Sequence, residues 1–295
     1  MQQLVATLLS GLTLGAVYAA FALALCLIWR STRVVNFAQA PMAMLTSYIA
    51  LTLIDHGINW WVAFAGALVS GFVLGAVVER ALIRRVEGKS ELNAVILTLG
   101  LFIVLHAVAA IVFGSTYRAF PAVFGLSGVE AGGHSIPITG FGIFTLVAVM
   151  VLLTLLVLLF HQTDLGLKMR ATAFSPETAR LLGVRVGRML TLGWALAAVA
   201  GALAGVLIAG RGPVSPGFMD SVMVYGFVAA VLGGLDSPLG SVVGGLVLGL
   251  ALSFVSGYHW LGGAGLVPIA SLVILIAVLL LRPGGLFSHV AARRV

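Results

Sequence analysis

Charge is scarce in this 295-residue chain: only 8% of its residues are Asp, Glu, Lys or Arg, whereas a soluble domain has roughly 25%. In contrast, 61% of the residues are hydrophobic, and apolar runs recur along the whole chain. This composition excludes a soluble catalytic or nucleotide-binding domain. It predicts an all-α, polytopic membrane protein with one domain over residues 1–295. The net charge of +7 comes from a few bases between apolar segments, so it indicates topology in a lipid membrane rather than binding to nucleic acid.

The motifs of catalysis and of nucleotide binding are also missing. The sequence has no His/Glu spacing typical of zinc sites, no GxSxG elbow and no GxxxxGKS/T loop. Cys26 is the single cysteine, which excludes a disulfide framework and a thiolate metal site and indicates a small buried side chain. We therefore expect a non-catalytic chain with no metal or cofactor of its own. If ATP drives transport, ATP and magnesium must be bound by partner ATPase subunits.

Carboxylates are nearly absent from the apolar segments. Transporters that use an ion gradient usually carry ionisable groups inside the bilayer, where such groups are costly and therefore functional. All nine acids fall in or beside the expected connections, and His106 alone stands near the centre of a segment. His106 fits a relay, a substrate contact or, as we favour, a hydrogen bond to a neighbouring helix. The pattern argues against coupling to protons or sodium.

Nine segments are candidate membrane spans, since a crossing takes about 20 apolar residues. The seventh is short enough for a half-helix or a re-entrant piece. Lys and Arg follow the first, third, fifth and last segments and are rare in the other connections, so the positive-inside rule places the N-terminus outside and the C-terminus in the cytoplasm, with about eight or nine spans. The first segment has no basic region before it and reads as a retained helix rather than a signal peptide. The segments are 4–28, 36–54, 60–82, 93–113, 142–161, 189–209, 221–235, 239–257 and 266–282.

Two connections are long enough to fold locally. Residues 114–140 are rich in Gly, Pro and Ser and predict an irregular cap over the outer mouth. Residues 161–188 contain SPETARLLG, which has the start and stop signals of a short cytoplasmic helix. We expect this helix to dock on an ATPase and carry its motion to the spans; the alternative is a solvated loop with an ordinary charge bias. The coupling residues are Ser175, Pro176, Glu177, Thr178, Arg180, Leu181, Leu182 and Gly183.

Glycine is abundant, with 37 residues. Pairs four residues apart remove bulk from one helix face and let two backbones approach, so we expect them at helix contacts, with a close crossing at Gly201 and Gly205. LTLG at 12–15 and LVLG at 246–249 weakly echo each other, as in transporters built from duplicated halves. The pairs are Gly11 and Gly15, Gly71 and Gly75, Gly201 and Gly205, Gly240 and Gly244, and Gly245 and Gly249.

Uncharged polar residues within the segments are candidates to line a translocation path. A zwitterionic or neutral substrate needs such groups, because a fixed charge would trap it and conduction requires weak binding. Each residue also fits a hydrogen bond between helices, worth about 0.6 kcal/mol. We expect Asn36 and Gln39 to face the bundle interior near the cytoplasmic end of the path. The candidates are Tyr18, Asn36, Gln39, Thr46, Asn93, Thr98 and Tyr225.

Seven stretches of the sequence are informative because of the order in which they occur. They begin with GLTLGAVYAAFALALCLIW at 11–29, which VVNFAQ at 34–39 follows, and continue with GSTYRAFP at 114–121 and GLKMRATAFSPETARLLGV at 166–184. VSPGFM at 214–219, AAVLGGLDSPLGSVVGGLVLGL at 229–250 and LRPGGLF at 281–287 complete the set. Together they resemble the inner-membrane permeases of ABC importers for branched-chain amino acids, the LivH type.

The resemblance implies a permease subunit in the inner membrane of a bacterium. Its partners would be a second, related permease in a heterodimer, two cytoplasmic ATPases and a periplasmic substrate-binding protein. Branched-chain amino acids are the implied substrates, and urea or short amides are alternatives within the family. Two other interpretations stay open: a passive small-solute channel, which would transport without ATP, and a structural subunit that has no path of its own.

Overall fold

The computed structural model describes residues 2–86, 90–125, 128–131, 134–258, 263–282 and 284–287. Helices make up most of these residues, as the composition predicts. They are α1 (Gln2–Thr32), α2 (Gln39–Asp55), α3 (Trp60–Ala81), α4 (Glu91–Phe113), α5 (Gly140–Gln162), α6 (Asp164–Phe174), α7 (Pro176–Leu181), α8 (Val186–Ala209), α9 (Asp220–Gly233), α10 (Pro238–Gly257) and α11 (Val267–Leu281), with 3-10 turns η1 (Ile83–Arg85) and η3 (Ala264–Leu266).

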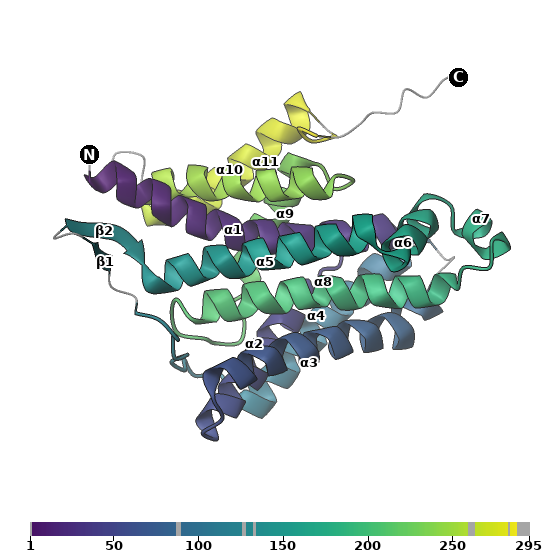
Figure 1. Ribbon diagram of the computed structural model, residues 1–295, viewed down its shortest axis with the longest axis horizontal. Coiled ribbons are helices and arrows are strands. Elements are labelled where there is room, and N and C mark those ends of the chain that lie inside the picture. The colour runs from purple at the N-terminus through teal and green to yellow at the C-terminus, as the bar shows by residue number, and fades with distance from the viewer. Residues whose placement is uncertain are drawn as a thin grey trace.

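The long helices run along a common axis, which gives the bundle two distinct ends (Figure 1). One end carries the N-terminus and two short strands, β1 (Gly128–Ala131) and β2 (His134–Thr139). We call it the hairpin end. The other end carries α6 and α7. Arg170 belongs to α6, Arg30 lines a pocket with it, and Arg84 donates to Gly187 at the start of α8, which follows α7. We call this second end the basic end.

Helix α1 lies at the centre of the bundle and contacts α5, α8, α9 and α10. Its segment 15–28 is buried throughout. Small side chains make this possible, because the alanines of AVYAAFALALC let several helices approach one backbone at once. Cys26 is buried there, as predicted, and its thiol lies 3.0 Å from the carbonyl oxygen of Leu235.

The glycine pairs of α1 and α10 face each other. A β-carbon on Gly249 would lie 2.2 Å from Cα of Gly15, and one on Gly245 would lie 2.4 Å from Cα of Ala19. A β-carbon on Gly11 would touch Leu250, so the two helices run antiparallel. The tetrapeptides LTLG and LVLG, which echo each other in the sequence, therefore meet at this contact.

The remaining glycine pairs lie at three other helix contacts. A β-carbon on Gly75 would lie 2.6 Å from the carbonyl oxygen of Trp194, where α3 meets α8, and Gly71 faces the next turn of α8. Gly240 and Gly244 face α9 in the same way: a β-carbon on Gly244 would lie 2.2 Å from the carbonyl oxygen of Ala229. Gly201 and Gly205 face α2 and are described with the site below.

Among the described residues, seven helices are long and apolar enough to cross a membrane: α1, α3 with η1, α4, α5, α8, α10 and α11 with η3. Helix α2 has 17 residues and α9 has 14. At 1.5 Å per residue α9 is about 21 Å long, less than the hydrocarbon core of about 30 Å. The prediction that the seventh segment is short is thus confirmed.

Both long connections differ from their predicted form. The connection 114–140 is not irregular throughout, because β1 and β2 pair antiparallel within it, with Glu130 opposite Ser135. The all-α prediction therefore misses one small hairpin. The connection 161–188 holds two helices instead of one: α6 precedes α7, and α7 ends at Leu181, before the predicted limit at Gly183.

Candidate functional site

The turn between α1 and α2 buries two of the predicted path residues. Asn36 and Gln39 are fully buried, and the Asn36 side-chain amide donates to Oε1 of Gln39 at 3.1 Å. Oδ1 of Asn36 accepts from the backbone N–H of Ala38 at 3.1 Å. The Gln39 amide donates to the carbonyl oxygen of Ala197 in α8 at 3.0 Å. The two side chains thus face the bundle interior, but their hydrogen bonds go to the protein.

Gly201 and Gly205 make room for this turn and for α2. A β-carbon on Gly201 would lie 2.2 Å from Nε2 of Gln39, and one on Gly205 would lie 2.7 Å from the carbonyl oxygen of Ala43. Ser47 also lies against Gly205. The α2–α8 crossing therefore requires glycine at both positions, because a side chain would displace backbone or the buried amide.

The other candidates on α2 and α4 differ in their surroundings. Thr46 is buried and donates to the carbonyl oxygen of Ala43 in its own helix at 2.8 Å. Thr98 is buried and donates to the carbonyl oxygen of Val95, with the Val35 carbonyl oxygen 3.5 Å away. Asn93 is exposed on the first turn of α4, outside the bundle interior.

Tyr18, near the middle of α1, meets Tyr225 of α9, with ring centroids 5.5 Å apart. Arg211, two residues after α8, interacts electrostatically with Tyr18, and burial lowers the pKa of its guanidinium while Tyr18 opposes that shift. Nε of Arg211 has no hydrogen-bond partner. The side chain lines a cavity of about 430 Å³ together with Ser10, Thr13 and Thr139. No signal in the sequence predicted this cavity.

At the basic end, α7 presents an apolar surface to solvent. The Ser175 side chain accepts from the Thr178 N–H at 3.3 Å, Pro176 occupies the first turn, and Gly183 has φ +78°, so the predicted cap and stop are present. Leu181 is 88% exposed and Leu182 76%. Glu177 and Arg180 are exposed on the same short helix.

The preceding helix α6 adds to that surface. Its side-chain cap is Thr163, whose hydroxyl accepts from the Gly166 N–H at 3.0 Å, and its last residue, Phe174, is 93% exposed. Ala179 of α7 is buried against Val186 and Leu190 of α8, which anchors α7 to a long helix. The Thr163–Asp164 pair is an ordinary helix-start signal and could have predicted α6.

A buried ion pair at the basic end joins two of the long helices. Glu79 is 1% exposed in α3 and lies 3.0 Å from Nη2 of Arg84. The Thr191 hydroxyl donates to Glu79 at 2.6 Å, and Arg84 donates to the carbonyl oxygen of Gly187 at 2.6 Å. Glu79 thus lies beside the connection that follows α3, as expected, but its carboxylate is inside the protein and joins α3 to α8.

His106 confirms the interpretation favoured by the sequence. Its Nε2 lies 3.0 Å from Oδ1 of Asp220, the first residue of α9, and its Nδ1 lies 2.9 Å from the Phe102 carbonyl oxygen. The ring therefore joins α4 to α9. In the described part of the chain no group of three or more His, Cys, Asp or Glu side chains could hold a metal ion.

Comparison with known proteins decides the family. The sequence model of the branched-chain amino acid transport system permease component matches residues 7–282. The chain belongs to this permease family. LivH, the permease protein of the high-affinity branched-chain amino acid transport system of Escherichia coli K12, is 31% identical over 97% of this chain and 96% of its own length. BraD, the corresponding protein of Pseudomonas aeruginosa PAO1, is 29% identical over 98% of this chain and 97% of its own.

A solved structure shows that the fold of this permease has a known counterpart. A chain of PsaBC from Streptococcus pneumoniae, solved in complex with Fab, matches 96% of this chain and 91% of its own length with a TM-score of 0.51. The two sequences are 15% identical. At this identity the likeness concerns the arrangement of helices alone.

Proposed function

We propose that this permease is the membrane subunit of an ATP-driven ABC importer that translocates branched-chain or related small amino acids into the cell. The observation that carries the proposal is the family match over residues 7–282, with relatives of equal length that serve branched-chain amino acid transport. The path candidates are polar and uncharged, which suits a zwitterion that must bind weakly and leave. Urea and short amides are alternative cargoes, because a separate binding protein would set most of the specificity.

The proposed assembly has a second, related permease, two cytoplasmic ATPases that bind ATP and magnesium, and a periplasmic binding protein. In support, this chain has no phosphate-binding loop, yet α6 and α7 expose Phe174, Leu181 and Leu182 at the basic end. Large apolar side chains gain free energy when a partner surface covers them. We propose that an ATPase groove covers them and that α7 passes its motion through α6 to α5 and directly to α8.

The distribution of Lys and Arg supports an orientation of the chain in the membrane. Lys and Arg concentrate at the end that carries α6 and α7, so we infer that this end is cytoplasmic and that the N-terminus is outside. With α2 and α9 as the two short crossings, the chain would span the inner membrane nine times. The test is labelling of single cysteines in spheroplasts: Thr116→Cys, at the hairpin end, should react with a membrane-impermeant maleimide, and Thr178→Cys should react only after lysis.

Cross-linking tests the coupling role of α7. A cysteine at Thr178 should form a disulfide or a short bifunctional cross-link with the ATPase, and the matched cysteine at Thr116 should not. Substitution of Glu177 and Leu182 together should leave insertion intact and lower substrate-stimulated ATP hydrolysis. If Thr178→Cys never cross-links and the double variant transports normally, α7 is not the coupling element. Transport without ATP and without a co-purifying ATPase would favour the passive channel instead.

A further inference from the structure

A largely apolar groove opens at the basic end, where α5 and α10 flank α1. Its volume is about 310 Å³. Leu27 of α1, Val157 and Phe160 of α5, and Val242 of α10 are among its apolar lining residues. Arg30 in the last turn of α1, His161 of α5 and Arg170 in α6 are its polar lining residues.

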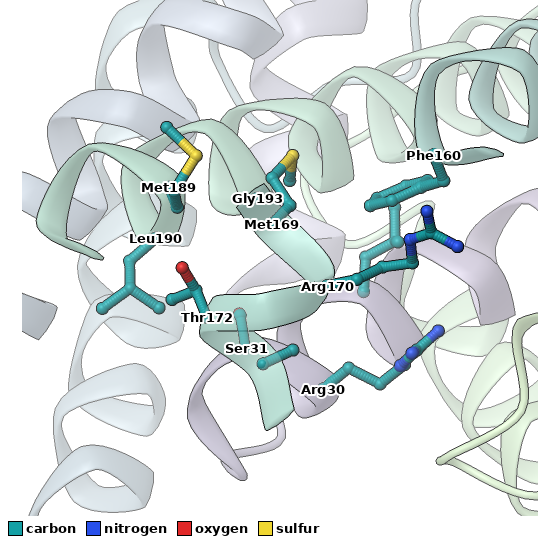
Figure 2. A pocket seen from close by; sticks show the side chains of 11 residues that line it. Arg30, Ser31, Phe160, Met169, Arg170, Thr172, Met189, Leu190 and Gly193 are labelled. Atoms are coloured by element: carbon teal, nitrogen blue, oxygen red, sulfur yellow. The ribbon is translucent and has the colours of Figure 1, made fainter. Parts of the chain in front are cut away.

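The two arginines are the unusual feature of this groove. Both also line the smaller adjoining pocket shown in Figure 2, where their guanidinium groups extend to the same side. Nε of Arg170 is shielded from solvent and has no hydrogen-bond partner. Among the described residues, neither Arg30 nor Arg170 forms an ion pair, whereas Arg33, Arg84 and Arg118 each pair with a carboxylate. Two half-buried cations without a counter-ion favour an anion from outside the chain.

The shape and chemistry of the groove restrict the occupant. A free amino acid does not fit well, because its ammonium group would find apolar walls and two positive charges. An anionic amphiphile fits both parts, since its head can meet the arginines while its chain covers the apolar walls. Basic pockets between helices at the cytoplasmic boundary have this character in lipid-binding membrane proteins. Here the cationic side chains lie at the end of α1 and the apolar lining lies deeper along α1, α5 and α10.

We propose that this Arg30–Arg170 groove binds an anionic phospholipid of the cytoplasmic leaflet. The phosphate group lies between the two guanidinium groups, and an acyl chain runs along Leu27, Val157 and Val242. The inference rests on the proposed function only through the placement of the basic end at the cytoplasmic face. Because Arg30 belongs to α1 and Arg170 to α6, the bound lipid also holds α6, and with it α7, against the central helix.

Native mass spectrometry of the purified full complex tests the proposal. Complex delipidated in detergent is titrated with phosphatidylglycerol or with phosphatidylcholine of the same acyl chains. The wild type should retain one phosphatidylglycerol more per copy of this permease than the Arg30→Gln/Arg170→Gln variant does. Phosphatidylcholine should show no such difference. The matched control is Arg188→Gln, an exposed basic residue of the same end that does not line the groove, and it should bind lipid as the wild type does.

A second variant covers the case in which loss of both arginines prevents assembly. Val242→Trp fills the apolar part of the groove and leaves both guanidinium groups in place, so it should also lose the retained phosphatidylglycerol. Equal retention by wild type and by every assembled variant overturns the proposal, as does equal binding of phosphatidylcholine. Cross-linking of a cysteine at Val157 to the second permease would overturn it too, because protein would then fill the groove. No arm measures transport or ATP hydrolysis, so these results do not depend on the identity of the cargo or on the coupling role of α7.

Discussion

Replacing Arg84 with Met should destabilise the permease more than any other single change at an exposed or half-exposed basic residue. Arg84 is 35% exposed, but its partner Glu79 is 1% exposed and accepts from Nε of Arg84 at 3.2 Å and from Nη2 at 3.0 Å. The substitution removes the cation and leaves the carboxylate buried. It also removes the donor to the Gly187 carbonyl oxygen, which holds the start of α8.

The expected loss follows from these contacts. Removal of one partner from a fully buried ion pair costs about 3–5 kcal/mol. Here water reaches one side of Arg84, and Thr191 still donates to Glu79, so we expect about 2–3 kcal/mol. Glu79→Gln keeps an acceptor for Arg84 and should cost less. The double variant Glu79→Met/Arg84→Met leaves no buried charge and should cost less than the sum of the single variants by about 1–3 kcal/mol.

Thermal unfolding of the purified complex measures these effects. The wild type, Glu79→Met, Arg84→Met and the double variant form a double-mutant cycle. Arg80→Met is the matched control, because Arg80 lies next to Glu79 in the last turn of α3 and is exposed. The reasoning would be refuted if Arg84→Met lowered the unfolding midpoint no more than Arg80→Met does. Strict additivity of the two Met substitutions would refute it as well, because it would show that Glu79 and Arg84 do not interact.

Three other predictions concern the bundle and the coupling helix. Gly205→Leu should lower the yield and the unfolding midpoint of the complex, because even a β-carbon would lie 2.7 Å from the Ala43 carbonyl oxygen. Gly100→Leu is the control, because a side chain at Gly100 meets open space in this chain. Equal behaviour of the two variants would contradict the α2–α8 crossing. Asn36→Leu leaves two buried groups unpaired at a cost of about 1–3 kcal/mol, and uptake measured per assembled complex should fall further than assembly does; an equal loss of both would make Asn36 purely structural. Ser175→Ala removes the cap of α7, worth about 0.5–2 kcal/mol, and should lower substrate-stimulated ATP hydrolysis, whereas Ser175→Asp should retain it; equal activity of both variants would show that the cap does not matter.

Local signals in the sequence predicted the parts of this permease that depend on local chemistry. The length of an apolar run determines whether a segment can cross a bilayer, and the short seventh segment became the short helix α9 for that reason. The start and stop of α7 follow from Ser175, Pro176 and Gly183 alone, since each acts on its own turn of backbone. The same kind of signal at Thr163 would have predicted α6.

Only the tertiary structure decided which faces meet. A glycine pair shows that a helix face is small, but it does not name the partner, so the contact of Gly15 with Gly249 and of Gly205 with Ala43 could not be read from spacing. The spacing of the path candidates also does not show which of them lie together. Asn36 and Gln39 are hydrogen-bonded to each other, and Gln39 also bonds to Ala197, whereas Asn93 is exposed on α4.

The positions of the charged residues could be predicted from the sequence, but their partners could not. The count and position of Lys and Arg predicted a basic end, because the positive-inside rule depends on which connections carry the charges. Whether a given charge finds a partner depends on residues far away in the chain: Arg84 reached Thr191, His106 reached Asp220, and Arg30 met Arg170 without a described counter-ion between them. Coulomb attraction and the cost of burial act over distances of a few ångströms in space, and the packing of the helices sets those distances.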